Sequence, residues 1–203
     1  WRHKILAAIR ALEGGISFSG IVEADELLMK YSEKGRKFKN KEEYQKAKKK
    51  KHPKVAVLVV TDREGNLLFK QVGEKKVKNE QLREELKSRL SENNLICVKP
   101  KKEFRKGVKG LQSKKVIVNK RQIKRGIYSV KIVESKISDF KTWLSRFHGV
   151  ATKYLQSYLM WFVIMNKYLK ELIDPDIGRL LNLSSHDRWA WDKYREIVSQ
   201  RYE

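Results

Sequence analysis

Three carboxylates lie inside an apolar segment near the start of the chain. The run from Ile21 to Met29 reads IVEADELLM, and it carries Glu23, Asp25 and Glu26 among residues typical of a buried β-strand. A carboxylate buried in a sheet is costly unless a cation neutralises it. We therefore expect this strand to face a metal ion or a fixed base, with Asp25 as the first ligand.

The rest of the sequence restricts which metal this would be. Cys97 is the only cysteine, and the four histidines are scattered without ligand spacing. This excludes a disulfide framework and a cysteine-based zinc site within the chain. Carboxylate ligands favour Mg²⁺ or Mn²⁺.

A second candidate ligand, Glu134, lies at the start of a helical pattern late in the chain. Two-metal phosphoryl transfer uses carboxylates that hold ions about 3.5–4 Å apart, and Glu134 is the natural last ligand beside Asp25. Lys141 follows Glu134 by seven residues, so both project from one face of a helix. Lys141 would then hold a phosphate or a base nearby. Taken alone, this spacing more often belongs to a solvent-exposed pair.

The net charge of +23 is concentrated in two segments. Residues 30–54 contain twelve Lys or Arg against three Glu, and residues 99–125 contain twelve against one Glu. Such segments predict a partner with phosphates, the alternative being solvated lysine-rich loops. A basic protein with an acidic strand points to enzymes that cut or rejoin nucleic acid. The candidate DNA contacts are Lys48, Lys49, Lys50, Lys51, Lys101, Lys102, Arg105, Lys106, Lys120, Arg121, Lys124 and Arg125.

The remaining pattern predicts the elements that position these side chains. Strands are predicted at 20–29, 54–61, 67–72, 95–98 and 116–118, with a further extended piece at 126–133. Helices are predicted at 2–12, from residue 79 to about residue 90, from about residue 135, over 154–172 and in the tail. Residues 34–51 are predicted to be a polar connection with some helix.

This order predicts an α/β fold of the ribonuclease-H-like type, in which a mixed sheet with an antiparallel hairpin beside parallel strands is flanked by helices. The first and fourth strands of such a fold lie side by side, and a late helix reaches their ends. Asp25, the residue that ends the fourth strand and Glu134 are therefore expected to converge.

Several segments resemble the Merlin-type (ISXO2-like) DDE transposases of bacterial insertion sequences. They are WRHKIL, GIVEADE, VLVVTDREGNLL, GIYSVKIVESKISDFKTWL and FHGVATKYLQSYLMWF, and the resemblance extends from Trp1 to about Phe162. It implies metal-dependent cleavage and strand transfer of double-stranded DNA by a homo-oligomer, with assembly into a larger nucleoprotein complex as a further expectation. Members usually begin with a zinc ribbon and a helix-turn-helix, and the sequence from Trp1 onward contains neither of them.

The resemblance assigns roles to three positions and reveals one departure. Asp25 matches the first catalytic aspartate, Glu134 the third metal ligand (commonly asparagine), and Lys141 the basic residue that follows it. The second aspartate should end the fourth strand, five residues before an aromatic; Phe104 matches this aromatic, so Lys99 occupies the aspartate position. An ammonium group cannot ligate a metal and repels a divalent cation. We expect it to pair with Asp25 and Glu134 instead.

Three functions stay open at this point. The first is a transposase-derived DNA-binding protein with a degenerate metal site. The second is an active transposase, in which Glu103 or Asp62 supplies the missing carboxylate or the alignment shifts. The third is a non-enzymatic basic protein that binds RNA.

The expected organisation is the end of an N-terminal helical segment at 1–15, a ribonuclease-H-like transposase domain at 16–173 and a helical tail at 174–203. The N-terminus lacks the apolar region of a signal peptide, and the most apolar window, residues 158–165, is too short to span a bilayer. We expect a cytoplasmic, nucleoid-associated protein with no membrane partner.

Overall fold

A five-stranded mixed sheet forms the centre of the computed structural model, which describes residues 3, 5–7, 15–118, 124–125, 127–168, 192 and 195. Its strands lie in the order β3-β2-β1-β4-β5. They are β1 (Ile21–Met29), β2 (Val55–Asp62), β3 (Leu67–Glu74), β4 (Leu95–Val98) and β5 (Lys114–Ile117). Strand β2 is antiparallel to both of its neighbours, β1 and β3, whereas β4 runs parallel to β1 and β5 parallel to β4. The predicted fold class is confirmed.

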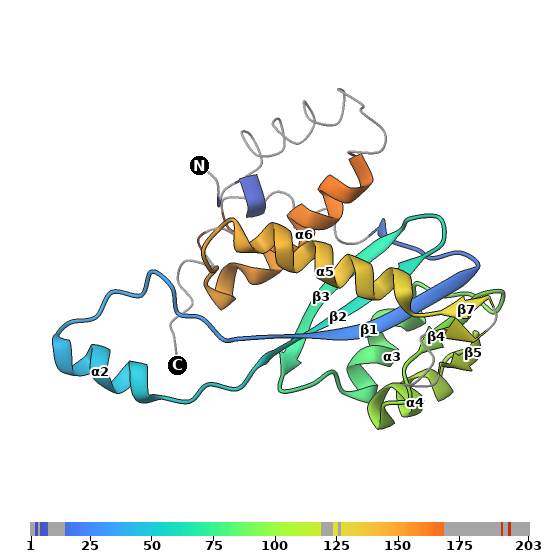
Figure 1. Cartoon of the computed structure of the whole chain (residues 1–203), viewed down its shortest axis with the longest axis horizontal. Helices are drawn as coiled ribbons and strands as arrows, with labels where there is room; N and C mark the ends of the chain where they lie inside the picture. The colour runs from blue at the N-terminus through green and yellow to red at the C-terminus, as the bar shows by residue number, and fades with distance from the viewer. Residues whose placement is uncertain are drawn as a thin grey trace.

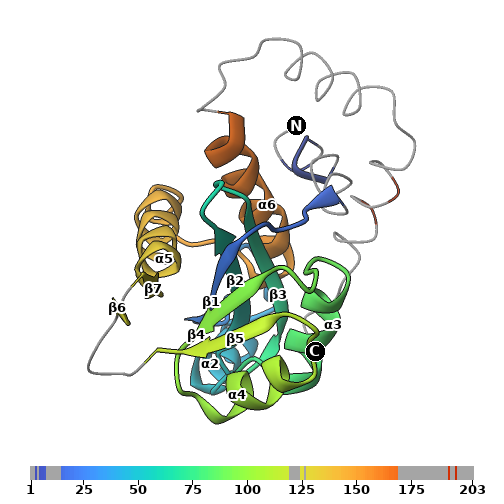
Figure 2. The ribbon, with the colours of Figure 1, turned by 90° about the vertical axis from the view of Figure 1, so that its right-hand side faces the viewer.

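Helices cover both faces of this sheet (Figure 2). The helices α3 (Asn79–Lys87) and α4 (Lys102–Lys109) cover one face, and α5 (Lys131–Ser145) and α6 (Thr152–Tyr168) cover the other. The interior strand β2, between β3 and β1, is consequently buried along its whole length, as expected for a strand with helices on both sides. Along the described part of the chain, no helix is long and apolar enough to cross a membrane.

Two helices differ from the sequence-based prediction. The structure has α4 where no helix is predicted, because its apolar residues Phe104 and Val108 stand among lysines and arginines and give a weak local signal. Helix α5 begins at Lys131 and not near residue 135, after the short hairpin of β6 (Lys124–Arg125) and β7 (Tyr128–Ser129). Residues 131–133, predicted to be extended, are therefore helical. The cause is a tertiary contact with β1, described below.

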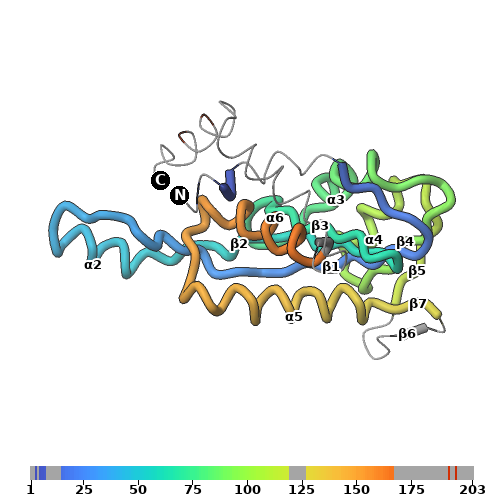
Figure 3. The backbone as a smooth tube through the Cα atoms, turned by 90° about the horizontal axis from the view of Figure 1, so that it is seen from above, coloured from blue at the N-terminus to red at the C-terminus, as the bar shows by residue number. Residues whose placement is uncertain are grey.

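Residues 30–54 form an arm that projects from the sheet between β1 and β2 (Figures 1 and 3). It carries helix α2 (Lys41–Lys49), which has no buried residue and whose first turn is capped by the Asn40 side chain. At the base of the arm, Tyr31 and His52 stack with their ring centroids 4.4 Å apart. The sequence-based prediction of a polar connection with some helix is confirmed.

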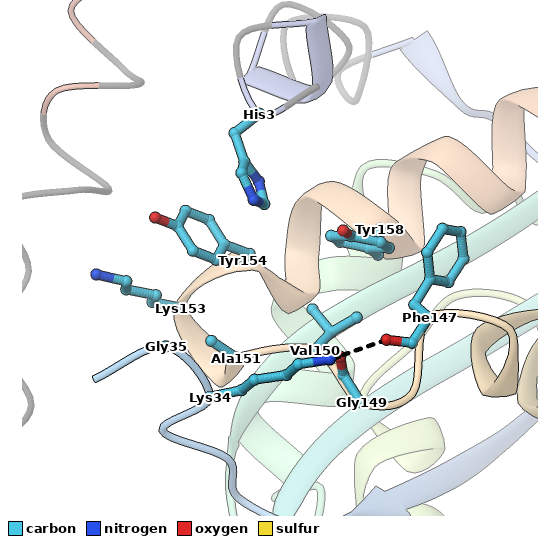
Figure 4. Close-up of a pocket in the computed structure, with 10 residues that line it drawn as sticks. All are labelled: His3, Lys34, Gly35, Phe147, Gly149, Val150, Ala151, Lys153, Tyr154 and Tyr158. Atoms are coloured by element: carbon cyan, nitrogen blue, oxygen red, sulfur yellow. Dashed lines mark hydrogen bonds between the residues drawn. The ribbon is translucent and has the colours of Figure 1, made fainter. Parts of the chain in front are cut away.

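The arm is held to the turn between α5 and α6. The Lys34 ammonium donates to the three carbonyls of residues 147–149 at 2.9–3.0 Å, and Ser32 and Thr152 exchange two hydrogen bonds. Gly149 permits this turn because its φ is 93°. Lys34, Phe147 and Gly149 border a cavity of about 270 Å³ that is also lined by Tyr154 and Tyr158 (Figure 4). Residues 149–152, the GVAT of the segment FHGVATKYLQSYLMWF, thus anchor the arm.

We expect Gly107→Ala to destabilise the contact between α3 and α4. A Cβ at this position would lie 2.5 Å from Leu82 Cδ2 and 3.1 Å from the Asn79 carbonyl oxygen, and Leu82 is fully buried. Overpacking of this kind costs about 1–3 kcal/mol, which lowers Tm by roughly 2–4 °C per kcal/mol in a chain of this length. Thermal denaturation followed by circular dichroism measures the change.

Gly110→Ala is the matched control for this substitution. The new Cβ would meet only the guanidinium end of Arg83, an exposed and flexible side chain that can move away. A Tm loss in Gly107→Ala no larger than that in Gly110→Ala would contradict the overpacking argument.

Candidate functional site

The register of the sheet brings Lys99 beside Asp25. Strands β1 and β4 are parallel, with Glu23 opposite Cys97 and Ala24 opposite Val98. The residues that follow this last pair are Asp25 on β1 and Lys99 after β4, so they lie side by side. The alignment that assigns Lys99 to the second aspartate position thus agrees with the strand pairing.

The Lys99 ammonium lies between the two predicted metal ligands. Its Nζ is 2.6 Å from Asp25 Oδ2 and 2.5 Å from Glu134 Oε1. Burial by itself lowers the pKa of Lys99, but the hydrogen bonds and negative charges of Asp25 and Glu134 outweigh it, so the pKa lies above its ordinary value of 10.5. Lys99 is consequently a permanent cation at neutral pH, and the ion pairs expected from the sequence are present.

A second lysine, Lys101, reaches the same cluster. Its Nζ is 3.2 Å from Asp25 Oδ1 and 2.8 Å from Glu26 Oε1. The sequence predicts a DNA contact for Lys101, whereas in the structure its ammonium pairs with two carboxylates. A sign of this was available in the sequence, because Lys101 follows Lys99 by two residues and Glu26 follows Asp25 directly.

The fully buried Glu23 carboxylate positions Glu134. Its Oε2 accepts from the backbone N–H groups of residues 132–133 at 2.8 and 3.1 Å, and its Oε1 accepts from Ser129 Oγ at 2.9 Å and Arg63 Nη2 at 3.1 Å. Glu23 therefore satisfies N–H groups that the first turn of α5 leaves without intrahelical partners. This contact begins α5 at Lys131 and sets Glu134 over Asp25.

The two carboxylates considered as replacements for the missing aspartate are engaged elsewhere. Asp62 accepts from the backbone N–H groups of Ser19 and Asn66 at 3.0 and 2.9 Å, and from the Asn66 amide at 2.7 Å, so it closes the β2–β3 turn. Glu103 pairs with Lys76, whose hydrogen bond lowers the pKa of Glu103. Neither carboxylate substitutes for the second aspartate in this structure.

The residues present do not fit a divalent ion. The family implies Mg²⁺ or Mn²⁺, but the oxygens of Asp25 and Glu134 that would bind it accept hydrogen bonds from Lys99. In the described ranges, no group of three or more His, Cys, Asp or Glu side chains is arranged to hold a metal. An ammonium within 3 Å of the carboxylates excludes a divalent cation from the same position by charge repulsion.

Cys97 lies fully buried beneath this cluster, and we expect its thiol to be unreactive. Burial, with a further contribution from the Glu23 charge, raises the pKa of Cys97 to about 11. The thiolate is the reactive form of cysteine, so at pH 8 a disulfide reagent such as DTNB should label the native protein only slowly. The denatured protein should react completely within minutes. Rapid stoichiometric labelling of the native state would contradict this expectation.

Exposed basic residues lie on α4, on the arm and on α5. Helix α4 buries Phe104, Gly107 and Val108, and its exposed residues are all cations; its one acid, Glu103, is partly buried. The candidates Lys102, Arg105 and Lys106 belong to this face, and together with Lys109 and Pro100 they line a groove. The residues at 48–51 are exposed on the arm, and Lys141 is exposed on α5.

The remaining candidates are only partly described. Lys120 and Arg121 lie outside the described residues, and the structure gives only the backbone of Lys124 and Arg125, as strand β6. The predicted boundaries at residues 15 and 173 stay predictions, since most of residues 1–15 and 174–203 also lie outside the described part.

The sheet order, the helices on both faces and the position of Asp25 on β1 define a ribonuclease-H-like domain. Residues 17–164 match the ISXO2-like transposase domain. The match covers well over half of the chain, and the chain therefore belongs to the ISXO2-like transposase family. The family predicted from the sequence is confirmed.

Two further comparisons are less informative. Among solved structures, the pre-cleavage Mos1 transpososome is similar at a TM-score of 0.35 and 11% sequence identity, covering 100% of this chain and 64% of the other. This chain thus spans less than two thirds of the length of that transposase chain. No curated protein matches the sequence.

Proposed function

We propose that this protein is a transposase-derived DNA-binding protein whose metal site is degenerate. The observation that carries the proposal is the Lys99 ammonium, which contacts both Asp25 and Glu134 where the family resemblance places a divalent ion. The carboxylates occupy the positions of metal ligands, but the cation between them is the ammonium group of Lys99. In such a site Lys99 neutralises the buried carboxylates, and no metal ion is held for phosphoryl transfer.

The charge distribution supports a DNA contact beside the former centre and not at it. Three carboxylates and two ammonium groups meet there, which leaves no net positive charge for a phosphate. The outer face of α4 has the opposite character, since Lys102, Arg105, Lys106 and Lys109 are exposed. Glu103, the one acid of α4, is paired with Lys76. We therefore place the duplex backbone along α4, with the arm as a second contact.

Duplex binding in the presence and absence of metal tests this function. With a fluorescent DNA duplex, we expect binding in EDTA to be at least as tight as in Mg²⁺, because Mg²⁺ only competes for the DNA phosphates, and we expect a plasmid to stay intact in Mg²⁺ or Mn²⁺. Metal-dependent cleavage that is lost in Asp25→Ala would instead establish the active transposase. Equal competition by structured RNA at matched salt would favour the RNA-binding alternative.

We expect the triple variant Lys102→Gln, Arg105→Gln and Lys109→Gln to weaken duplex binding and to reduce its salt dependence. Each lost phosphate contact lowers the slope of log K against log salt by about 0.9, so the full change is about 3. A salt titration by fluorescence anisotropy measures it. The matched control is Lys78→Gln, Arg83→Gln and Lys87→Gln, at the N-cap and on the exposed face of α3, which removes the same charge. Equal losses in the two triple variants would attribute binding to net charge alone and overturn the role of α4.

By the same resemblance, we propose that the protein acts as a homo-oligomer on DNA. Light scattering after size-exclusion chromatography, with and without duplex, tests this; a monomer under both conditions would contradict it.

A further inference from the structure

The former metal centre contains two ammonium groups with one carboxylate between them. Asp25 accepts from Lys99 through Oδ2 at 2.6 Å and from Lys101 through Oδ1 at 3.2 Å. Each lysine also pairs with an outer carboxylate, Lys99 with Glu134 at 2.5 Å and Lys101 with Glu26 at 2.8 Å. The order of charges is therefore carboxylate, ammonium, carboxylate, ammonium, carboxylate.

This is the connectivity of a two-ion site, in which one shared carboxylate binds two cations and each cation has a further ligand. We infer that Lys99 and Lys101 together replace both cations, and that the carboxylates remain a latent divalent-metal site closed by two residues of the chain. The inference rests on the degenerate site of the proposed function. It extends that proposal by making Lys101 a second blocking group.

The backbone holds both lysines toward the same carboxylate. They flank Pro100, whose ring restricts φ, and the Lys101 N–H donates to the Lys99 carbonyl at 2.8 Å. Lys101 is also the N-cap residue of α4, and its carbonyl accepts from the Arg105 N–H at 2.9 Å. The start of α4 therefore fixes the position from which the Lys101 side chain reaches Asp25.

Burial separates this arrangement from an ordinary surface ion pair, which contributes little. Only 6% of the Asp25 side chain and 13% of the Glu26 side chain is exposed, and the Lys101 ammonium also lies 5.7 Å from the centre of the Phe104 ring. Restoring an aspartate at position 99 alone would leave the Lys101 charge on Asp25 Oδ1. A metal ion bound by Asp25 would then be repelled by the Lys101 ammonium on the same carboxylate.

Mn²⁺ binding by a set of variants tests the role of Lys101. The proteins are the wild type, K99D, K101M and the double variant K99D/K101M, with K99D/K87M as the control because Lys87 is an exposed lysine on α3. Mn²⁺ is the probe, and binding is measured by the loss of the free-ion EPR signal and by the Tm difference between Mn²⁺ and EDTA. We expect K99D/K101M to bind Mn²⁺ at least tenfold more tightly than K99D or K99D/K87M. The wild type and K101M should show no binding.

Three results would overturn the inference. They are Mn²⁺ binding by the wild type, equal binding by K99D and K99D/K101M, and no binding by a folded K99D/K101M. If K99D/K101M does not fold, K99N/K101M replaces it, because asparagine adds an oxygen ligand without a further negative charge. Duplex binding by the wild type in EDTA is measured in parallel. If the wild type binds DNA in EDTA but the folded double variant does not bind Mn²⁺, this inference is wrong and the proposed function is unaffected.

Discussion

Lys99→Met is expected to lower the melting temperature by roughly 4–12 °C. The substitution leaves the Asp25 and Glu134 carboxylates facing each other without the ammonium that separates them. Breaking a fully buried pair costs about 3–5 kcal/mol, but Lys99 and Glu134 retain 27% and 34% of their side-chain exposure, so we expect about 2–3 kcal/mol. At about 2–4 °C per kcal/mol this gives the stated shift.

Differential scanning calorimetry measures the change, and Lys102→Met is the control. Lys102 lies three residues further along the chain and is exposed on α4, so the same chemical change there should leave Tm nearly unaltered. A Tm loss in Lys99→Met no larger than in Lys102→Met would show that Lys99 does not neutralise the cluster.

The direction of the pKa shift sets the pH range of this difference. Because Asp25 and Glu134 raise the pKa of Lys99 above 10.5, the charged lysine contributes its full stabilisation below pH 10.5. The contribution is lost only as the pH rises through the higher pKa of the folded protein. The Tm difference between the wild type and Lys99→Met should therefore stay constant from about pH 7 to 9, below the ordinary lysine pKa.

Glu23→Ala is expected to destabilise the domain by about 3–4 kcal/mol, because each buried donor left without an acceptor costs about 1–3 kcal/mol. The substitution removes the acceptor of two backbone N–H groups in the first turn of α5 and of the Ser129 hydroxyl. It also leaves a cavity in a fully buried position. Urea denaturation measures the loss, with Glu92→Ala as an exposed control.

A local measurement distinguishes this role from general loss of packing. Hydrogen exchange of the amides at 132–134 should accelerate in Glu23→Ala more than exchange elsewhere in α5. Glu23→Gln should restore much of both losses, because its amide oxygen can accept from the same N–H groups. Unchanged exchange at these amides would contradict the assignment of Glu23 as the group that holds the start of α5.

Local signals predicted most of the sheet. Strand β1 follows its apolar run, β2 and β3 follow the hairpin with turn residues at 62–66, and β4 matches its predicted bounds at 95–98. Each of these depends on side chains within a few positions of one another. The same applies to Lys99, whose place was found from a short motif ending in Phe104.

Helices α4 and α5 show where local signals fail. The apolar residues of α4 are too few among its cations to suggest a helix, yet they pack against α3 because Gly107 allows close approach to Leu82. The start of α5 depends on Glu23, more than a hundred residues earlier in the chain. Neither contact can be predicted from the residues next to it in the sequence.

The sequence by itself determined the family and the ribonuclease-H-like sheet, and it predicted that Lys99 stands at the position of the second aspartate, since these depend on residue order and short-range pattern. The tertiary structure alone decided that Lys101 joins Asp25, that Glu23 holds α5 and that Lys34 ties the arm to the α5–α6 turn. These contacts join residues 76 to 115 positions apart. The physical reason is that charges and hydrogen-bond donors select partners by distance in the folded chain; the parallel pairing of β1 with β4, for example, brings Lys101 to Asp25.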